Sequence, residues 1–183
     1  MALLRNQKSR SAPARRLLRR FLRNKQGATA VEFALVALPF FALLYAILET
    51  GLVFFTQEVL QTAVTSSARL IMTGQAQTQN LSAAQFQQDV CNQASSLFTC
   101  SGIYVNVQKF SSFTSVSMLN PLQNGNFQSG SMNYNTGGPG DIIVVQVFYQ
   151  WPVFLGPLGF NLTNMNGNYR LLQATAVFRN EPY

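Results

Sequence analysis

Residues 27–56 read GATAVEFALVALPFFALLYAILETGLVFFT, and this stretch decides how the chain is organised. Between Phe33 and Leu48 no residue is charged, and apolar residues resume after Glu49. A helix over residues 28–56 would be roughly 43 Å long at 1.5 Å per residue, which is enough to cross a hydrocarbon layer of about 30 Å. We therefore expect one transmembrane helix over residues 28–56.

The segment that precedes this stretch is strongly basic. Nine of the 13 lysines and arginines lie in residues 1–26, which contain no acidic residue, so about +9 of charge gathers in this tail and about −2 remains elsewhere. A basic tail could bind nucleic acid, but positive charge beside an apolar span typically stays on the cytoplasmic side and sets the orientation. We expect residues 1–27 to be a cytoplasmic tail or leader, with no nucleic-acid partner.

A basic segment followed by an apolar core also fits a removable signal peptide. No small-x-small cleavage site follows the apolar core closely, so we expect a retained single-pass anchor, with residues 57–183 exported. Leu60, Val64, Ala68 and Ile71 recur at helical spacing, which extends the predicted helix beyond the membrane to about residue 73.

A second helix is predicted over residues 82–98. Ser82 and Gln85 have the spacing of a capping box, and Phe86 begins an apolar face at helical spacing. Cys91 and Cys100 lie nine positions apart, on and just after this helix. In an exported domain they can form a structural disulfide if the helix ends between them, with a stabilisation of about 2.5 to 3 kcal/mol in the entropic treatment. A redox or metal pair is the alternative, but the cysteines lack C-x-x-C spacing.

Three segments alternate as strands do, over residues 102–109, 141–151 and 170–179. The segment 141–151 is apolar on both faces, which predicts a central strand. With the helices, these strands predict an α+β domain in which a small antiparallel sheet packs on helices.

Two segments between the strands read differently. Residues 111–140 are rich in Ser, Asn, Gly and Gln and predict a long surface loop. Residues 151–160, WPVFLGPLGF, are apolar and broken by Pro and Gly, and predict either a buried connector or a surface that meets the membrane or a partner subunit.

Few residues offer chemistry. The chain has no histidine and two cysteines, which are too few for a Cys-only zinc site. The exported part also lacks a nucleophile motif such as G-x-S-x-G. We expect no enzymatic activity, no metal and no cofactor.

The residues around Glu32 carry a motif. Basic residues, then Gly27, four small residues from Ala28, Glu32, Phe33 and an apolar run resemble a type IV prepilin leader. In that family a membrane peptidase on the cytoplasmic side cuts after the glycine. On charge placement alone Glu32 could equally lie at the cytoplasmic interface, since a carboxylate is less costly at the end of a span than at its centre.

More specifically, the chain resembles the TadE-like family (TadE, TadF and TadG pseudopilin-type proteins) of the tight-adherence Flp pilus machinery. Three patches carry the resemblance: residues 27–35 (GATAVEFAL), residues 140–147 (GDIIVVQV) and residues 174–183 (ATAVFRNEPY). It implies a pilin-like helix whose lower half is transmembrane.

The resemblance also implies a function. A minor pilin, pseudopilin or assembly factor of a bacterial type IVb (Flp/Tad) pilus is expected, in the inner membrane with a periplasmic or filament-borne C-terminal domain. Its implied partners are other pilins, pilus assembly proteins and a prepilin peptidase. The implied sites are the Gly27–Ala28 bond for leader cleavage and Glu32 with Phe33 for assembly. A membrane-anchored binding or adhesion domain without a filament role is the alternative.

Overall fold

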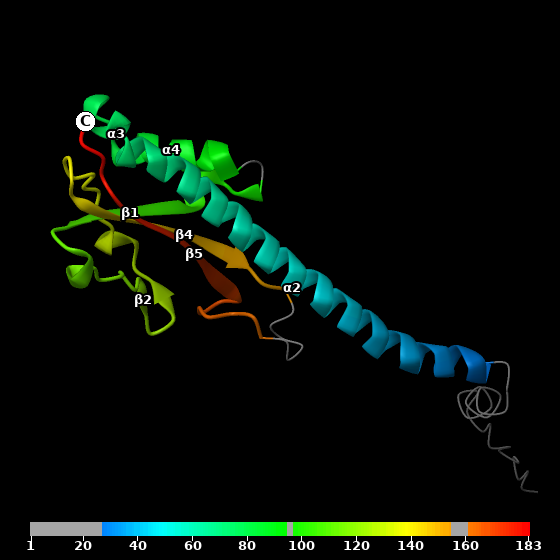
Figure 1. Cartoon of the computed structure of the whole chain (residues 1–183). Helices are drawn as coiled ribbons and strands as arrows, with labels where there is room; N and C mark the ends of the chain where they lie inside the picture. Colours follow the sequence, from blue (N-terminus) through cyan, green and yellow to red (C-terminus); the bar gives the residue numbers. More distant parts are fainter. Residues whose placement is uncertain (1–26, 95–96, 155–160) are drawn as a thin grey trace, which may run out of the picture. The chain divides into compact units, whose positions relative to one another are not determined.

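The structure, a computed structural model, describes residues 27–94, 97–154 and 161–183. The predicted tail over residues 1–26 and most of the apolar connector, residues 155–160, lie outside the described residues. Two compact units divide the chain, Met1–Tyr45 and Ala46–Tyr183, and we describe each by itself. The elements are α2 (Ala28–Met72), α3 (Gln75–Thr78), α4 (Ala83–Ala94), β1 (Ile103–Phe110), β2 (Leu122–Gln123), β3 (Asn126–Phe127), β4 (Ile142–Pro152) and β5 (Tyr169–Arg179) (Figure 1).

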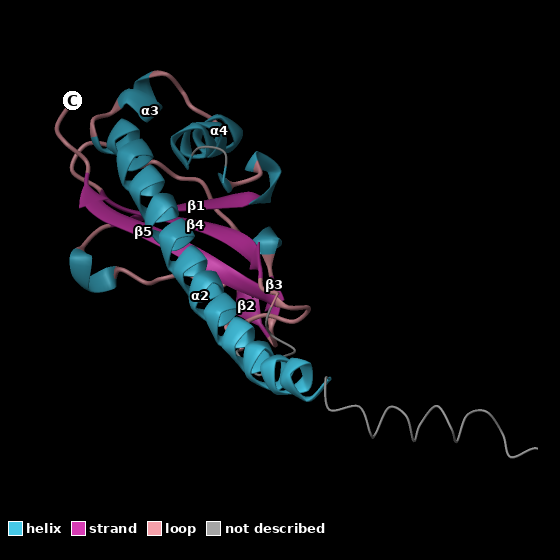
Figure 2. Cartoon of the chain, turned by 90° about the vertical axis from the view of Figure 1, so that its right-hand side faces the viewer, coloured by secondary structure: helices cyan, strands magenta, loops and turns pink. Residues whose placement is uncertain are grey.

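The C-terminal unit, Ala46–Tyr183, is built on a three-stranded antiparallel sheet of order β1-β4-β5. In its centre Val145 of β4 lies opposite Val107 on one side and Ala176 on the other. The part of α2 after Ala46 and α4 lie side by side on one face of this sheet (Figure 2). The α+β class and the central position of the strand predicted over residues 141–151 are both confirmed.

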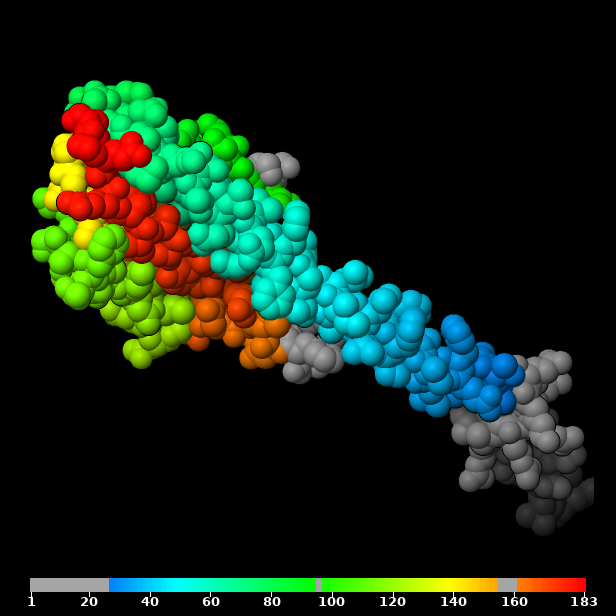
Figure 3. Space-filling view, viewed as in Figure 1, coloured from blue at the N-terminus to red at the C-terminus, as the bar shows by residue number. Residues whose placement is uncertain are grey.

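Helix α2 ends close to the predicted position, and the C-terminus closes its end. Gly74 follows with φ 78°, a left-handed conformation that favours glycine. The ring of Tyr183 stands where a Cβ on Gly74 would lie, and the backbone N–H of Glu181 donates to the carbonyl of Met72. The C-terminal residues accordingly lie against the end of α2 (Figure 3).

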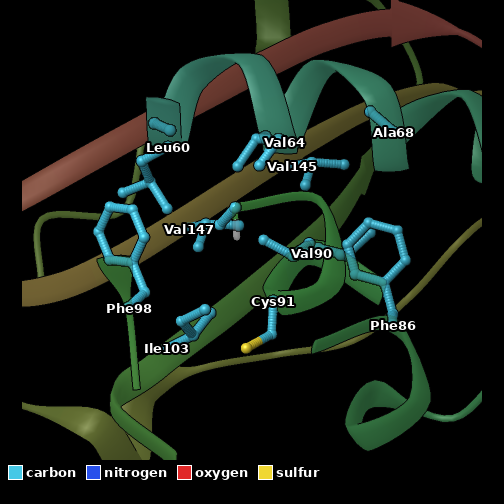
Figure 4. Close-up of a cluster of buried hydrophobic side chains, with 14 of the residues drawn as sticks. Leu60, Val64, Ala68, Phe86, Val90, Cys91, Phe98, Ile103, Val145 and Val147 are labelled. Carbon is cyan, nitrogen blue, oxygen red and sulfur yellow. The ribbon is translucent and has the colours of Figure 1, made fainter. Parts of the chain in front are cut away.

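The core lies between the helices and the sheet (Figure 4). Fully buried side chains reach it from four elements: Leu60, Val64 and Ile71 of α2, Phe86 and Val90 of α4, Ile103 and Val107 of β1, and Val145 and Val147 of β4. The apolar positions recognised from helical and strand spacing are therefore the residues that fill the core. At about 25 cal/mol per Å² of apolar surface, each large side chain buried here contributes about 1.5 to 3 kcal/mol.

The opposite face of the sheet is covered by part of residues 111–136, which belong to the long surface loop predicted over residues 111–140. They contain the β2–β3 hairpin, and Tyr134 forms a parallel bridge to Val107. The amides of Asn106 and Gln146, both fully buried, hold this segment in place. Gln146 Oε1 accepts from Asn106 Nδ2 and from the backbone N–H of Leu119, and its Nε2 donates to the Leu119 carbonyl. Buried amides need such partners, so the network specifies how the segment lies on the sheet.

Helix α4 begins as predicted and ends earlier. The Ser82 backbone N–H donates to Gln85 Oε1 and the Gln85 N–H to Ser82 Oγ, which confirms the capping box. The described part of the helix ends at Ala94, and Leu97 and Phe98, near the predicted end, lie outside the α-helix. Cys91 and Cys100 are joined by a disulfide with their Cα atoms 5.4 Å apart, whereas nine residues of helix would separate them by about 13.5 Å. A continuous α-helix from Cys91 to Cys100 is therefore excluded.

The outer edge of β5 is covered by side chains of α2. Gln61 Nε2 donates to the Thr175 carbonyl, and Gln61 Oε1 accepts from the Thr175 N–H. One turn earlier Gln57 Nε2 donates to the Gln173 carbonyl. Four residues of helix rise about 6 Å and two residues of strand about 6.8 Å, so the two glutamines match alternate strand positions. They occupy backbone groups that would otherwise leave an open sheet edge.

We expect Gln61→Met to lower the free energy of unfolding by about 1 to 2 kcal/mol, because it removes two hydrogen bonds to a half-buried edge strand while keeping the length of the side chain. The control is Gln88→Met on the exposed face of α4, where a change within about 0.5 kcal/mol is expected. Urea unfolding of the full chain in detergent micelles, followed by the fluorescence of its single tryptophan, measures both. Equal midpoints for the two variants would contradict the edge role of Gln61.

Candidate assembly site

The first unit presents the part of α2 between Ala28 and Tyr45. The whole of α2, Ala28–Met72, is long and apolar enough to cross a membrane, and is a candidate span by length and composition. Its large side chains are exposed on all sides, as Phe33 (71% exposed) and Leu38 (74%) illustrate on different faces. Apolar surface of this extent marks a contact with lipid or with other proteins.

The predicted cleavage residues lie at the start of this helix. Gly27 is exposed, and a Cβ built on it would meet nothing within 4 Å. Ala28 is the first residue of α2, and Glu32 follows one turn later on the same face, also exposed. The geometry therefore leaves the Gly27–Ala28 bond sterically open in the described part of the chain. It also puts a carboxylate one turn from the amino group that a cut would create.

Glu49, the charged residue that interrupts the apolar stretch, is buried in the structure. It belongs to the C-terminal unit and is only 6% exposed. Its Oε1 accepts a hydrogen bond from the backbone N–H of Phe154, just after β4. The two glutamates of the apolar stretch thus differ: Glu32 is exposed, and Glu49 is bound to its own domain. No periodicity in the sequence indicates the pairing of Glu49 with Phe154, because the residues are 105 positions apart.

The second and third patches of the family resemblance come together in the fold. Residues 140–147 enter β4 and residues 174–183 include the end of β5, and Ile142 lies opposite Arg179. The turn before β4 is tied to the segment after β5 by two backbone bonds, Gly140 N–H to the Asn180 carbonyl and Asn180 N–H to the Asp141 carbonyl. These patches form a structural corner of the C-terminal unit.

The charged groups of this corner are arranged for stability. Gly138 N–H donates to Asp141 Oδ2, and Lys109 Nζ lies 3.2 Å from the same oxygen. The Gly138 bond first, and then the Lys109 ammonium, lower the pKa of Asp141 below its usual value. Beside it is a surface hollow of about 510 Å³ lined by Pro139, Gly140, Arg179, Asn180, Glu181 and Pro182.

Tyr134 carries a half-buried phenol, and its residue bridges to Val107 of β1. Burial raises the pKa of Tyr134 to about 12, so its phenol is neutral near pH 7. Among residues 27–94, 97–154 and 161–183, no three His, Cys, Asp or Glu side chains are grouped as metal ligands would be. The disulfide uses both cysteines of the chain.

Comparison with known proteins identifies one segment. Residues 27–69 match the family described as TadE-like protein, which confirms the resemblance seen in the first patch. The match covers the apolar helix from Gly27 and most of the part that packs on the sheet. This is a family of pilus structural and assembly proteins. No curated protein and no solved structure matches the chain.

We expect Asp141→Asn to reduce the loss of stability at low pH. Because the folded-state pKa of Asp141 is lowered, its contribution is complete above the unfolded value of about 3.9 and disappears as the pH falls through the folded value. The melting temperature of the full chain, measured from pH 7 down to pH 2, should therefore fall less steeply below pH 4 in the variant. Asp89→Asn on α4 retains the Asp141 group and should keep the wild-type steepness. An unchanged slope in Asp141→Asn would contradict this assignment.

Proposed function

We propose that this chain is a minor pilin, pseudopilin or assembly factor of a bacterial type IVb (Flp/Tad) pilus, anchored in the inner membrane by α2. The basic tail would lie in the cytoplasm, and the C-terminal unit in the periplasm or in a surface filament. The observation that carries this proposal is the match to the TadE-like family over residues 27–69, which coincides with the helix that exposes apolar side chains on all sides.

The exposed helix supports an anchoring and assembling role. Between Val31 and Tyr45 most large apolar side chains are at least half exposed. Leaving each such side chain in water costs about 1.5 to 3 kcal/mol relative to burial, so this segment requires lipid or the helices of other subunits. A pilin-type helix uses both environments in turn, lipid before assembly and neighbouring helices after it.

The position of Glu32 supports a role in that transfer. A cut after Gly27 would create an ammonium on Ala28, four residues before an exposed carboxylate. In an apolar environment a charge is stable only when it is paired. We propose that Glu32 of one subunit pairs with the Ala28 ammonium of an adjacent subunit, with Phe33 packing beside them, and that this selects partners as the helix leaves the lipid. The partners would be other pilins and pilus assembly proteins, with a prepilin peptidase acting first.

A membrane-anchored binding or adhesion domain is the second candidate function. The hollow beside Arg179 and Glu181 is the observation that favours it, because it places one charge of each sign at an open surface. Under this alternative, substitutions at the start of α2 would leave binding by the C-terminal unit unchanged, and no filament would depend on the chain.

We expect a prepilin peptidase to cleave between Gly27 and Ala28. N-terminal sequencing of the protein from cells with and without the peptidase tests this: Ala28 should be the first residue in the former and the full tail should remain in the latter. Gly27→Val should block the cut, because a branched side chain occupies the open space at the scissile bond. An N-terminus unaffected by the peptidase would remove processing from the proposal while leaving the anchor.

We expect Glu32→Ala to reduce pilus output about tenfold or more while membrane insertion is unchanged, since loss of an interaction of about 1.4 kcal/mol shifts an equilibrium tenfold. Glu32→Gln should show a similar defect if charge is required. The control is Glu58→Ala, which removes another exposed carboxylate from the same helix. Surface pili are counted after shearing, and insertion is measured by extraction of membranes with carbonate. Normal output from Glu32→Ala would exclude the pairing role.

A further inference from the structure

Within the C-terminal unit, the exposed side chains of α2 change from apolar to polar at Thr56. Before Thr56 the large exposed side chains are apolar: Ile47, Leu48, Leu52, Phe54 and Phe55. After Thr56 the fully exposed residues are polar or charged: Glu58, Thr62, Thr65, Ser66 and Arg69. The section of α2 around Thr56, cyan in Figure 3, is uncovered on the face in view. The change occurs along a single helix, as expected where a helix passes from an apolar environment into water.

Glu49 lies on the apolar side of this change, about 9 Å along the helix from Phe55. Its carboxylate does not point outward with its neighbours but is buried, and it accepts the backbone N–H of Phe154. That bond places Phe154, two residues after the end of β4, at the same level of the helix as Glu49. The side chain of Phe154 is nevertheless 68% exposed. A folded domain therefore presents an exposed phenylalanine beside the apolar section of its helix.

We propose that Phe154 and the exposed face of α2 from Ile47 to Phe55 form a lipid-contacting surface by which the C-terminal unit is seated in the membrane interface. The inference rests on the proposed membrane anchor and adds to it a second contact, made by the folded domain. Lipid is the occupant because the surface continues along the same helix from the candidate span, and its described members expose no charged side chain between Ala46 and Phe55.

A position near the membrane would explain why Glu49 and the backbone of Phe154 are bonded to each other. An unpaired carboxylate and an unpaired backbone N–H are both unfavourable near hydrocarbon. Each satisfies the other here, so the chain can pass below the interface at this point. An exposed phenylalanine ring is stabilised by entering the boundary between head groups and acyl chains, where Phe154 would lie. The seating would hold the sheet at a set orientation to the membrane.

Quenching by brominated lipid tests the proposal on the full chain. The protein carries one tryptophan, so Trp151→Phe provides a silent background into which a single tryptophan is placed at position 154, 113 or 41. Phe113 is the control for an exposed aromatic of the C-terminal unit, because it follows the end of β1 that pairs with Ile142, at the other end of the sheet from Phe154. Phe41 lies in the candidate span. Each variant is reconstituted in phosphatidylcholine vesicles with or without bromine on the upper acyl chain.

The proposal predicts that tryptophan at 154 and at 41 loses most of its emission in brominated vesicles, while tryptophan at 113 keeps it. Quenching at 41 without quenching at 154 would overturn the seating and leave the anchor intact. Quenching at neither would overturn the anchor as well. Emission at 154 that resists both brominated lipid and aqueous acrylamide would mean that protein covers Phe154, which also overturns the proposal.

A second measurement avoids the Trp151 substitution. A nitroxide is attached to Phe154→Cys, with the native disulfide left oxidised. Under the proposal its collisions with dissolved oxygen exceed those with an aqueous nickel chelate, as expected in lipid. The reverse order would overturn the proposal.

Discussion

The contact of α2 with the sheet is the interaction on which the C-terminal unit depends. Leu60, Val64 and Ile71 are fully buried from one face of this helix, and the core strand β4 receives them with Val145 and Val147. The sheet covers only one side of α2, and from Thr56 onward the fully exposed residues of that helix are polar. Before Ala46 the described residues offer no such cover. A single helix therefore has a section that packs on the sheet and a section whose apolar side chains are exposed.

Polar contacts fix how the helix and the sheet are aligned. Hydrophobic burial alone does not specify a register, because apolar contacts are not directional. Gln61 supplies direction by bonding both backbone groups of Thr175, and the buried Asn106–Gln146 pair does so on the other face of the sheet. Each pair leaves buried or half-buried groups unsatisfied if the elements slide. The domain is consequently held in one arrangement at the outer edge of β5 and at the face of the sheet that carries Asn106 and Gln146.

The three patches that resemble the TadE-like family have separate physical roles. Residues 140–147 and 174–183 pair as neighbouring strands and close a corner through Asp141 and Asn180, which is a structural task. Residues 27–35 begin a helix that the described fold does not cover. The first patch is thus exposed, and it is the one of the three that the family match includes.

The sequence by itself determined the elements. Helical spacing identified the buried face of α2, alternation identified the three strands, and apolarity on both faces of residues 141–151 indicated the central one. These are local periodicities that arise from backbone geometry. Only the tertiary structure decided the early end of α4, the covering of the sheet by residues 111–136, the edge contacts of Gln61 and the burial of Glu49. Each depends on a partner distant in the sequence, and glutamines or a glutamate carry no periodic signal for the partner that they will meet. The disulfide shows the limit most clearly, because nine residues of continued helix would hold its two cysteines about 13.5 Å apart, whereas their Cα atoms lie 5.4 Å apart.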